Sequence, residues 1–468
     1  MKKTILLPIF LLFLASVSAQ NFVKISTGTE YTMALGSDGV LWTWGFNGNG
    51  QLGIGTNDLF ISSPQALEGK DWADVETGSF HCLALKTDGT LWAWGLNNLG
   101  QLGNGDNIEQ RSPVQVGTDN DWKQIEAGQG HSIAIREDGT LWTWGFNING
   151  QLGNNSMANV NVPTKVNEDT DWTDIAAGGG HTLALKENGE LWAWGANFTG
   201  QLGDSSTVNS NIPVLVDDEN VWIDVDAGFE FSLGLRDDNT LWSWGFNGNS
   251  QLGLGDQTQR LAPTQIAQEN NYIKIGAGGS YAFAINDGNE LFAWGFNLRG
   301  ALGTGNTQEQ STPVQVGADN DWTMIAAAEG AIVNNAVFGL HSVGLKGDQM
   351  SVCVSGSNYV GQLGTDNTVD ILNFDCSVGV GLVDVEETYA FSGNIGIAPN
   401  PTTGIIRIDH DYEEVELSLL DMIGNRVLYQ NSNKNSENMD LSLLPSGVYW
   451  LKAQRGLDVV TRKIVKID

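Results

Sequence analysis

Four histidines recur at equivalent places in this chain and are its first candidates for chemistry. They are His81, His131, His181 and His341, and the other copies of the position hold Tyr31, Phe231 and Tyr281. Imidazoles often bind metal ions, but equivalent positions in separate structural units should lie too far apart to share one ion with bonds of about 2 Å. Because tyrosine and phenylalanine replace histidine, the position demands a bulky ring, and we interpret these residues as packing residues.

Acidic loops form a second recurring set. They read Asp119-Asn-Asp121, Asn167-Glu-Asp-Thr-Asp171, Asp217-Asp-Glu219 and Asp319-Asn-Asp321. Oxygen ligands at this density are typical of calcium sites, but the spacing of an EF-hand is absent. We therefore interpret the loops as solvated polar turns before a strand, and we expect neither a metal ion nor a cofactor.

Seventeen tryptophans form a third set. Aromatic faces can stack on sugar rings, but here the tryptophans repeat in pairs such as Trp42 and Trp44, and single ones such as Trp72 and Trp122 open another segment. Large side chains at equivalent positions are what packing between structural units requires, so we assign them to the core.

Enzyme motifs are absent from the sequence. It contains no His-Glu-x-x-His, no Gly-x-Ser-x-Gly, no phosphate-binding loop that ends Gly-Lys-Ser/Thr, and no dinucleotide fingerprint followed by a helix. We expect no catalytic residue, although separate units of a repeat can still bring a pair of carboxylates together.

These residues are positioned by a repeat. The segment Leu41–Gly53 returns at a step of 50 residues, and a weaker seventh copy runs from Val352 to Gly364. The intervening copies are Leu91–Gly103, Leu141–Gly153, Leu191–Gly203, Leu241–Gly253 and Leu291–Gly303. A fixed period of this size indicates a solenoid or a propeller, whose units bury their apolar faces only by stacking.

Each unit has the pattern of four short strands. Side chains alternate in polarity from His131 to Arg136, and Asp138-Gly139 then favours a two-residue hairpin. After each Gln-Leu-Gly, a polar loop leads to a proline that opens a further strand, such as Val114-Gln-Val after Pro113. Without any helical pattern, four antiparallel strands per unit predict an all-β, seven-bladed propeller.

The sequence allows two ways of closing the ring. The first unit begins directly at Phe22, without a proline-led strand before it, and Phe374 to Val380 has the right place to supply that strand. Leu382-Val-Asp-Val-Glu is the alternative, as an eighth partial strand. The seventh unit also carries an insertion from Glu329 to Phe338, and insertions map to loops on one face.

The N-terminus reads as a secretory signal peptide. Residues 1–19 have a basic start, an apolar centre too short to span a bilayer, and small residues that suit cleavage between Ala19 and Gln20. No later segment has about 18 consecutive apolar residues, so we expect a soluble or surface-attached protein without a transmembrane segment.

The formal charge is −32, from 23 basic and 55 acidic residues. Such a surface repels phosphate backbones, so nucleic-acid binding is disfavoured. Of the three cysteines, Cys353 and Cys376 are candidates for a disulfide in an exported protein, whereas Cys82 reads as a small buried residue.

The repeat ends before the C-terminal part of the chain. Composition changes near Ser392, and alternating runs separated by turn residues predict a small β-sandwich over residues 392–468. We therefore divide the chain into a signal peptide (1–19), a propeller (20–380), a linker (381–391) and this terminal domain.

The repeat resembles the regulator of chromosome condensation repeat. The shared motifs are Gly-x-x-His-x-x-Ala-Leu, as in Gly78–Leu85, followed by Leu-Trp-x-Trp-Gly-x-Asn-x-x-Gly-Gln-Leu-Gly. The resemblance implies a seven-bladed propeller. Some members exchange guanine nucleotides on a small GTPase and others are interaction platforms, so the fold alone does not determine the function.

The terminal domain resembles the type A C-terminal sorting domain of the type IX secretion system. The matching residues are Pro399, Asn400, Pro401, Gly404, Gly424, Gly447, Lys463 and Lys466. The resemblance implies export across the outer membrane, followed by release or by attachment at the cell surface, and contact with the type IX machinery.

Our leading hypothesis is therefore an exported, monomeric, non-enzymatic propeller that binds a protein or glycan on one rim. Rim candidates are Glu329, Asn334 and Asn335 in the insertion. A glycan-active enzyme that uses loop carboxylates is the alternative, and it requires a face loop that brings two acids and an arginine or histidine into one pocket. Nucleotide exchange, by family analogy only, is a third.

Overall fold

The computed structural model describes most of the propeller and the strands of the terminal domain. The described residues are 21–217, 219–266, 271–330, 332–333, 336–337, 339–347, 351–376, 395–398, 405–410, 415–420, 426–432, 436–444, 447–455 and 458–466. The chain divides into two compact units, residues 1–381 and 382–468. The predicted signal peptide, with Ala19 and Gln20, lies outside the described residues, and so does the segment that begins at Leu382.

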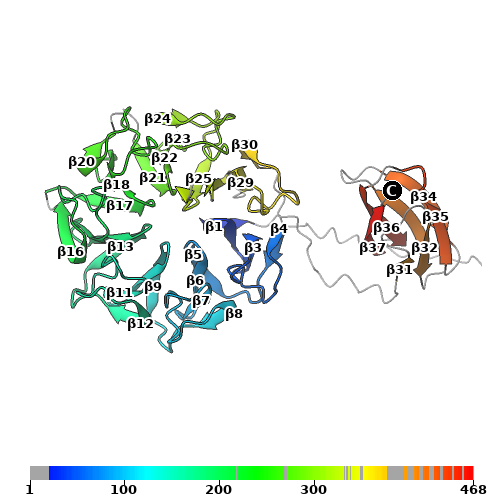
Figure 1. The fold of residues 1–468 in the computed structure, drawn as a ribbon, viewed down its shortest axis with the longest axis horizontal. Coiled ribbons are helices and arrows are strands. Elements are labelled where there is room, and N and C mark those ends of the chain that lie inside the picture. The colour runs from blue at the N-terminus through cyan, green and yellow to red at the C-terminus, as the bar shows by residue number, and fades with distance from the viewer. Residues whose placement is uncertain are drawn as a thin grey trace, which may run out of the picture. The chain divides into compact units, whose positions relative to one another are not determined.

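Seven four-stranded antiparallel blades form the first unit, as predicted (Figure 1). The innermost strands are β1 (Phe22–Thr27), β5 (Trp72–Thr77), β9 (Trp122–Ala127), β13 (Trp172–Ala177), β17 (Trp222–Ala227), β21 (Tyr272–Ala277) and β25 (Trp322–Ala327). The second strands are β2 (Tyr31–Gly36), β6 (His81–Lys86), β10 (His131–Arg136), β14 (His181–Lys186), β18 (Phe231–Arg236), β22 (Tyr281–Asn286) and β28 (His341–Lys346).

The outer half of each blade holds the remaining two strands. The third strands are β3 (Leu41–Phe46), β7 (Leu91–Gly95), β11 (Leu141–Gly145), β15 (Leu191–Gly195), β19 (Leu241–Gly245), β23 (Leu291–Gly295) and β29 (Ser351–Gly356). The fourth are β4 (Phe60–Ala66), β8 (Gln110–Gln115), β12 (Val160–Lys165), β16 (Ser210–Asp217), β20 (Arg260–Gln265), β24 (Gln310–Gln315) and β30 (Ile371–Asp375). Within the insertion, β26 (Ile332–Val333) pairs with β27 (Ala336–Val337).

Local sequence explains the turns and the outer strands. Gly139 has φ +76°, and a Cβ there would lie 2.0 Å from the carbonyl oxygen of Thr170, so the turn needs glycine. Where asparagine replaces it, Asn239 and Asn289 adopt φ of 61° and 57°. The fourth strand begins before its proline, since β8 starts at Gln110 and contains Pro113. The outer edge of the sheet tolerates the missing donor.

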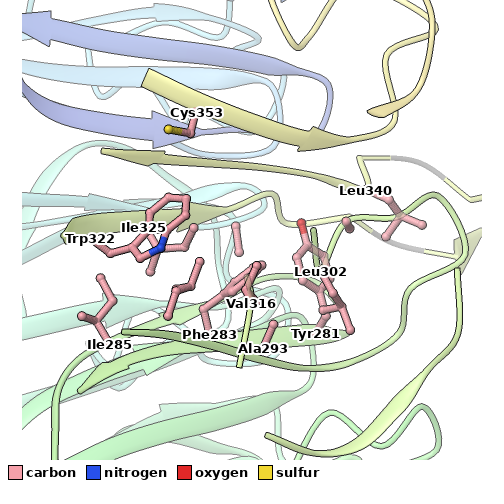
Figure 2. Packing of buried hydrophobic residues seen from close by; sticks show 13 residues of the cluster. Tyr281, Phe283, Ile285, Ala293, Leu302, Val316, Trp322, Ile325, Leu340 and Cys353 are labelled. Carbon is pink, nitrogen blue, oxygen red and sulfur yellow. The ribbon is translucent and has the colours of Figure 1, made fainter. Parts of the chain in front are cut away.

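Aromatic side chains join each blade to the next. Six third-strand tryptophans, Trp44, Trp94, Trp144, Trp194, Trp244 and Trp294, are fully buried. Their indole nitrogens donate to glutamine carbonyls of the preceding blade, as from Trp144 Nε1 to Gln101 O at 2.9 Å. The apolar cluster between the last two blades combines Tyr281, Phe283 and Ile285 with Trp322 and Ile325 (Figure 2). The packing role predicted for these tryptophans is confirmed.

Ring closure does not use the first alternative, in which the stretch from Phe374 to Val380 adds a strand to the first blade. The first blade is complete in β1–β4, and β30 pairs with β29 in the seventh blade, so the end of the repeat region does not supply a strand to the first. The reason is that each blade is one continuous stretch of chain, whose four strands follow one another in sequence order. Trp44 Nε1 donates to Gln362 O at 2.9 Å and Asp366 N to Ser62 O at 2.9 Å, which closes the ring.

Phe374, at the end of the seventh blade, replaces a missing tryptophan. In the seventh blade, the third strand carries Ser355 where the other third strands carry tryptophan. The Ser355 hydroxyl donates to Ala301 O at 3.2 Å. The Phe374 ring lies 4.9 Å from the Trp322 ring and against Gly303, where other blades place the indole. The volume lost by one substitution is therefore filled from the neighbouring strand.

The second unit contains two small sheets. One has the order β31 (Ile395–Ala398), β32 (Ile405–His410), β35 (Ser436–Asp440), and the other β34 (Arg426–Ser432), β33 (Val415–Leu420), β36 (Gly447–Arg455), β37 (Asp458–Lys466). Ile406 and Ile408 of the first sheet share one buried cluster with Leu417 and Leu419 of the second. This shared core is compatible with the predicted sandwich.

Candidate functional site

A cavity of about 500 Å³ lies where the innermost strands of the seven blades meet. Two positions in each innermost strand, separated by one residue, supply most of the polar side chains around it. In chain order the first position holds Lys24, Asp74, Gln124, Asp174, Asp224, Lys274 and Met324, and the second holds Ser26, Glu76, Glu126, Ala176, Asp226, Gly276 and Ala326. Carboxylates therefore outnumber lysines around the axis of the ring.

One side of the cavity neutralises its own charges. Lys24 forms ion pairs with Asp74 and, at 2.5 Å, with Glu76. Ser26 Oγ donates to the other oxygen of Glu76 at 3.0 Å. Although burial lowers the pKa of Lys24, the two carboxylates raise it well above its usual value. An ammonium group held by two carboxylates is thus already part of this wall.

On the opposite side, carboxylates accept hydrogen bonds from neutral donors. Asp174 accepts a hydrogen bond from Gln124 Nε2 at 2.8 Å, and Asp226 accepts from the backbone nitrogens of Ala227 and Ala277 at 2.8 and 2.7 Å. Lys274 donates instead to the carbonyl of Thr323. Negative charge in this wall is therefore held mainly by neutral donors.

Burial shifts the titration of these carboxylates. It raises the pKa of Asp226 to about 7. It also raises the pKa of Asp174, and the pKa values of Glu126 and Asp224 lie well above their usual range, because neighbouring carboxylates add to the effect of burial. Asp226 therefore titrates near neutral pH, and carboxyls with raised pKa values are common at functional sites and also in structural clusters.

Glu329, one of the three rim candidates, lines this cavity. It is 9% exposed, and it accepts a hydrogen bond from Ser79 Oγ of the second blade at 3.2 Å. Burial raises its pKa to about 8. Asn334 and Asn335 lie outside the described residues. The insertion therefore contributes a buried carboxyl to the centre of the ring.

The two faces of the ring carry different loops, because strand direction alternates within each blade. We call one the long-loop face. It carries the turns between first and second strands and the long loops 47–59, 96–109, 146–159, 196–209, 246–259, 296–309 and 357–370. The other, the hairpin face, carries the turns between second and third strands and the acidic loops that connect blades.

A buried asparagine holds each long loop. Asn197 is fully buried, its Oδ1 accepts from Leu202 N at 3.0 Å, and its Nδ2 donates to the carbonyl of Val208 at 3.2 Å. The equivalents are Asn47, Asn97, Asn147, Asn247, Asn297 and Asn358. Each long loop also bonds to the fourth strand of the next blade, as Ser205 N does to Leu261 O at 2.8 Å. The long loops are therefore fixed at both ends and in the middle.

Apolar side chains protrude from these fixed loops. They belong to six of the seven blades and are 40% to 71% exposed. They are Leu59, Ile108, Ile148, Met157, Phe198, Val208, Leu298, Tyr359 and Val369. Six blades thus each present one or two exposed apolar side chains on the same face, where a partner could contact them.

On the hairpin face, the acidic loops bind cations of the protein itself. The guanidinium of Arg136 lies 4.3 Å from the Trp122 ring and 4.2 Å from the Trp142 ring, and it pairs with Asp119. Similar clusters surround Lys86, Lys186, Arg236 and Lys346. The loops are thus parts of ion-pair clusters. The interpretation as merely solvated turns was incomplete, because it left out their cations.

The repeated histidines lie between blades. All four are fully buried, and His81 Nε2 lies 2.9 Å from Ser132 Oγ of the next blade. His341 makes the corresponding contact with Thr32 at 3.0 Å, across the point where the ring closes. Burial lowers the pKa of His81 to about 3, so its ring is neutral. Within the described residues, no three acidic, histidine or cysteine side chains form a metal-binding group.

Both units of the chain match known family models. Residues 8–333 match the model of the RCC1-like domain, and residues 396–467 match that of the secretion system C-terminal sorting domain. The chain belongs to the RCC1-like family. Its seventh blade extends past the matched range, and its terminal domain implies sorting by the type IX secretion system.

Solved structures agree on the fold of the RCC1-like propeller. Human WBSCR16 has 23% identity and a TM-score of 0.60, over 66% of this chain and 85% of that one. Prp20p of Saccharomyces cerevisiae has 19% identity and a TM-score of 0.63, over 76% and 86%. At these identities the likeness concerns fold alone. No curated protein matches the chain.

The remaining predicted sites belong to the end of the propeller and to the sorting domain. Cys353 and Cys376 form a disulfide, which ties the end of β30 to β29, and Cys82 is a buried free thiol. In the sorting domain Gly447 opens β36, and Lys463 and Lys466 lie in β37. Pro399, Asn400, Pro401, Gly404 and Gly424 lie outside the described residues. No helix in the described part of the chain is long and apolar enough to cross a membrane.

Sequence reasoning missed the acidic cavity, although a signal for it exists. In each innermost strand the two cavity positions are separated by one apolar residue, as in Asp224-Val-Asp226. When the seven repeats of the RCC1-like propeller are aligned, the residues at these two positions form the ring of carboxylates. These two positions differ between blades, whereas the packing positions repeat, and variation within a repeat is where a site is expected.

Proposed function

We propose that this chain is an exported, non-enzymatic binding module that holds a protein partner on the long-loop face of its propeller. The observation that carries the proposal is the exposed apolar set on that face, in six of seven blades. Membership of the RCC1-like family supports a binding role.

Rigid loops favour binding. Each long loop is held by its buried asparagine and by a backbone hydrogen bond to the next blade, so little conformational entropy remains to be lost on association. Exposed side chains such as Ile148 and Phe198, on neighbouring blades, then offer preorganised contacts to a partner.

The arrangement of charged groups favours binding over catalysis. A second cavity, of about 240 Å³, is lined by Asp204, Asp217 and Arg236, the combination that an enzyme would require. Asp204 already accepts hydrogen bonds from Asn197 and Ser206. Arg236 pairs with Asp217 at 2.9 Å, an arrangement that other blades repeat. These groups serve the fold, so this cavity gives no support to glycan cleavage.

Nucleotide exchange rests on analogy alone. Prp20p binds Gsp1p and histones. The predicted signal peptide and the sorting domain direct this chain out of the cytosol. A small GTPase is not expected outside the cytosol. Finding the protein only in the cytosol would restore the analogy.

Export follows from the sorting domain, and we infer that the propeller then acts at the cell surface or in the medium. Fractionation of cells that carry a type IX system tests this step. The full chain should reach the surface or the medium, and a chain truncated after residue 391 should remain in the periplasm. Equal export of both chains would contradict the role given to the terminal domain.

The binding role is tested by capture from the surface of the native cells. The wild-type chain is compared with Ile148→Ser/Phe198→Ser on the long-loop face and with Ile223→Ser as a control, because Ile223 is 49% exposed on an innermost strand. The double variant should lose its captured protein and the control should retain it. Unchanged capture by the double variant would refute the proposal.

A further inference from the structure

On the long loops, the arginines form ion pairs, whereas several carboxylates do not. Three arginines lie on these loops or at their ends, and each forms an ion pair with a local carboxylate: Arg111 with Glu109 at 2.6 Å, Arg260 with Asp256 at 2.7 Å and Arg299 with Asp370 at 2.9 Å. Further carboxylates on the same loops have no ion-pair partner among the described residues. They are Asp58, Asp106, Asp204, Glu309 and Asp366. The unpaired charge of this face is therefore negative.

The acidic cavity reaches the same face. Each innermost strand runs from the hairpin face to the long-loop face, and its last residues, such as Thr27 and Thr77, line the cavity. Glu329, in the turn that follows β25, lines it as well. Glu30, in the equivalent turn of the first blade, is buried, and its Oε1 has no hydrogen-bond partner. Glu329 thus belongs both to a turn of this face and to the wall of the cavity.

The cavity wall also shows what it can bind. Lys24 is held by Asp74 and Glu76 on one side. Across the cavity, Asp174 and Asp226 accept hydrogen bonds from amide donors. A lysine or arginine side chain from outside would find there the same kind of partner that Lys24 has.

We propose that the long-loop face binds a basic polypeptide segment whose apolar side chains pack on the exposed apolar residues of the long loops and one of whose lysine or arginine side chains enters the acidic cavity. This inference rests on the proposed function and names the chemistry of the partner. A purely polar polycation would leave the apolar loops in contact with water. An anionic membrane would be repelled by the unpaired carboxylates. A polypeptide that is both basic and apolar satisfies the two features together.

The test uses the full chain and three synthetic peptides of equal length. One alternates lysine with leucine, the second replaces lysine by glutamate, and the third replaces leucine by serine. Titration calorimetry at moderate salt should give clear binding of the first peptide, none of the second, and affinity for the third lower by about tenfold or more. Equal binding of the first and third peptides, or any binding of the second at comparable strength, would overturn the proposal.

Matched variants separate a site from general attraction to an acidic protein. At pH 8.5, where most of the Asp226 and Glu329 carboxyls are ionised, Asp226→Asn/Glu329→Gln should lower affinity for the lysine–leucine peptide about tenfold, and Ile148→Ser/Phe198→Ser should lower it similarly. The charge control is Glu137→Gln/Asp237→Asn, two exposed hairpin-face positions, which should change affinity less than twofold. An equal loss in this control would show that net charge alone attracts the peptide, against the proposal.

The same variants distinguish the two levels of inference. If Ile148→Ser/Phe198→Ser abolishes capture of a native partner while the lysine–leucine peptide does not bind, the binding function stands and the basic partner is refuted. If Ile148→Ser/Phe198→Ser changes neither the capture of a native partner nor the affinity for the peptide, both proposals fail. Thermal melting confirms that every variant is folded at the temperature of the titration.

Discussion

The two faces of the propeller are built at opposite ends of the same strands, yet they use polar and apolar residues in opposite ways. On the hairpin face, cations such as Arg136 stack on tryptophans and form ion pairs with the acidic loops. The positive and negative side chains of this face therefore neutralise one another. On the long-loop face, buried asparagines hold the loops and apolar side chains point to solvent. The hairpin face is thus explained by stability, whereas the long-loop face carries features that stability does not require.

Removing the common scaffold should affect both faces and produce the largest effect. Trp144 is fully buried between blades and bonds to Gln101 O, so Trp144→Ala should lower the free energy of unfolding by about 3 to 5 kcal/mol. The half-buried Trp142, on the same strand, is the control, and Trp142→Ala should cost less. Denaturant unfolding measures both. A larger loss at Trp142 would reverse our assignment of core and surface.

The disulfide should give the next largest effect. It closes a loop with a sequence separation of 23 and joins β29 to the end of β30, so Cys376→Ser should lower the free energy of unfolding by about 3 kcal/mol. Thermal unfolding of the wild-type chain with and without reductant checks this. If the variant and the reduced protein melt like the oxidised protein, the disulfide does not stabilise the seventh blade.

Much of the fold was predictable because packing residues repeat. The 50-residue period, the Asp-Gly turns and the paired tryptophans predict seven four-stranded blades, and the structure has them. Closure was not predictable from strand counting, since it depends on contacts such as Trp44 with Gln362. Sequence distance also hid the partner of each acidic loop. Asp119 and Arg136 meet only because the loop and the end of the second strand lie at the same end of the blade.

The candidate site was less predictable than the fold. Glu329 was singled out because it belongs to an insertion, but its place in the central cavity depends on the path of the turn after β25. The carboxylates of the innermost strands, such as Asp226, lie within short alternating segments that also look like ordinary strands. Only closure of the ring brings side chains 50 residues or more apart around one axis.

The cavity should make stability depend on pH in an unusual direction. Burial raises the pKa of Asp226 to about 7 and that of Glu329 to about 8, above the values of about 4 expected in the unfolded chain. The folded state therefore retains protons that the unfolded state has lost. The stability that these groups contribute is complete below about pH 4 and declines as pH rises through 7 to 8.

We expect the wild-type chain to lose about 1 kcal/mol between pH 7 and pH 8.5, a range in which the buried histidines are neutral in both the folded and the unfolded chain. Asp226→Asn/Glu329→Gln should flatten this dependence, because neither replacement titrates. Denaturant unfolding across the pH range measures the slope. Parallel profiles for the variant and the wild-type chain would show that these two carboxyls do not control it.

The smallest effect on stability should separate the two faces most sharply. Arg136→Ala removes a cation between two tryptophans and its ion pair with Asp119, so it should lower the free energy of unfolding by about 1 kcal/mol. It should leave partner capture unchanged, because the lost contacts are internal to the hairpin face. Phe198→Ser should do the reverse, with stability within about 0.5 kcal/mol of the wild-type value and weaker capture, because its ring is 62% exposed. Loss of capture in Arg136→Ala at unchanged stability would move the binding surface to the hairpin face.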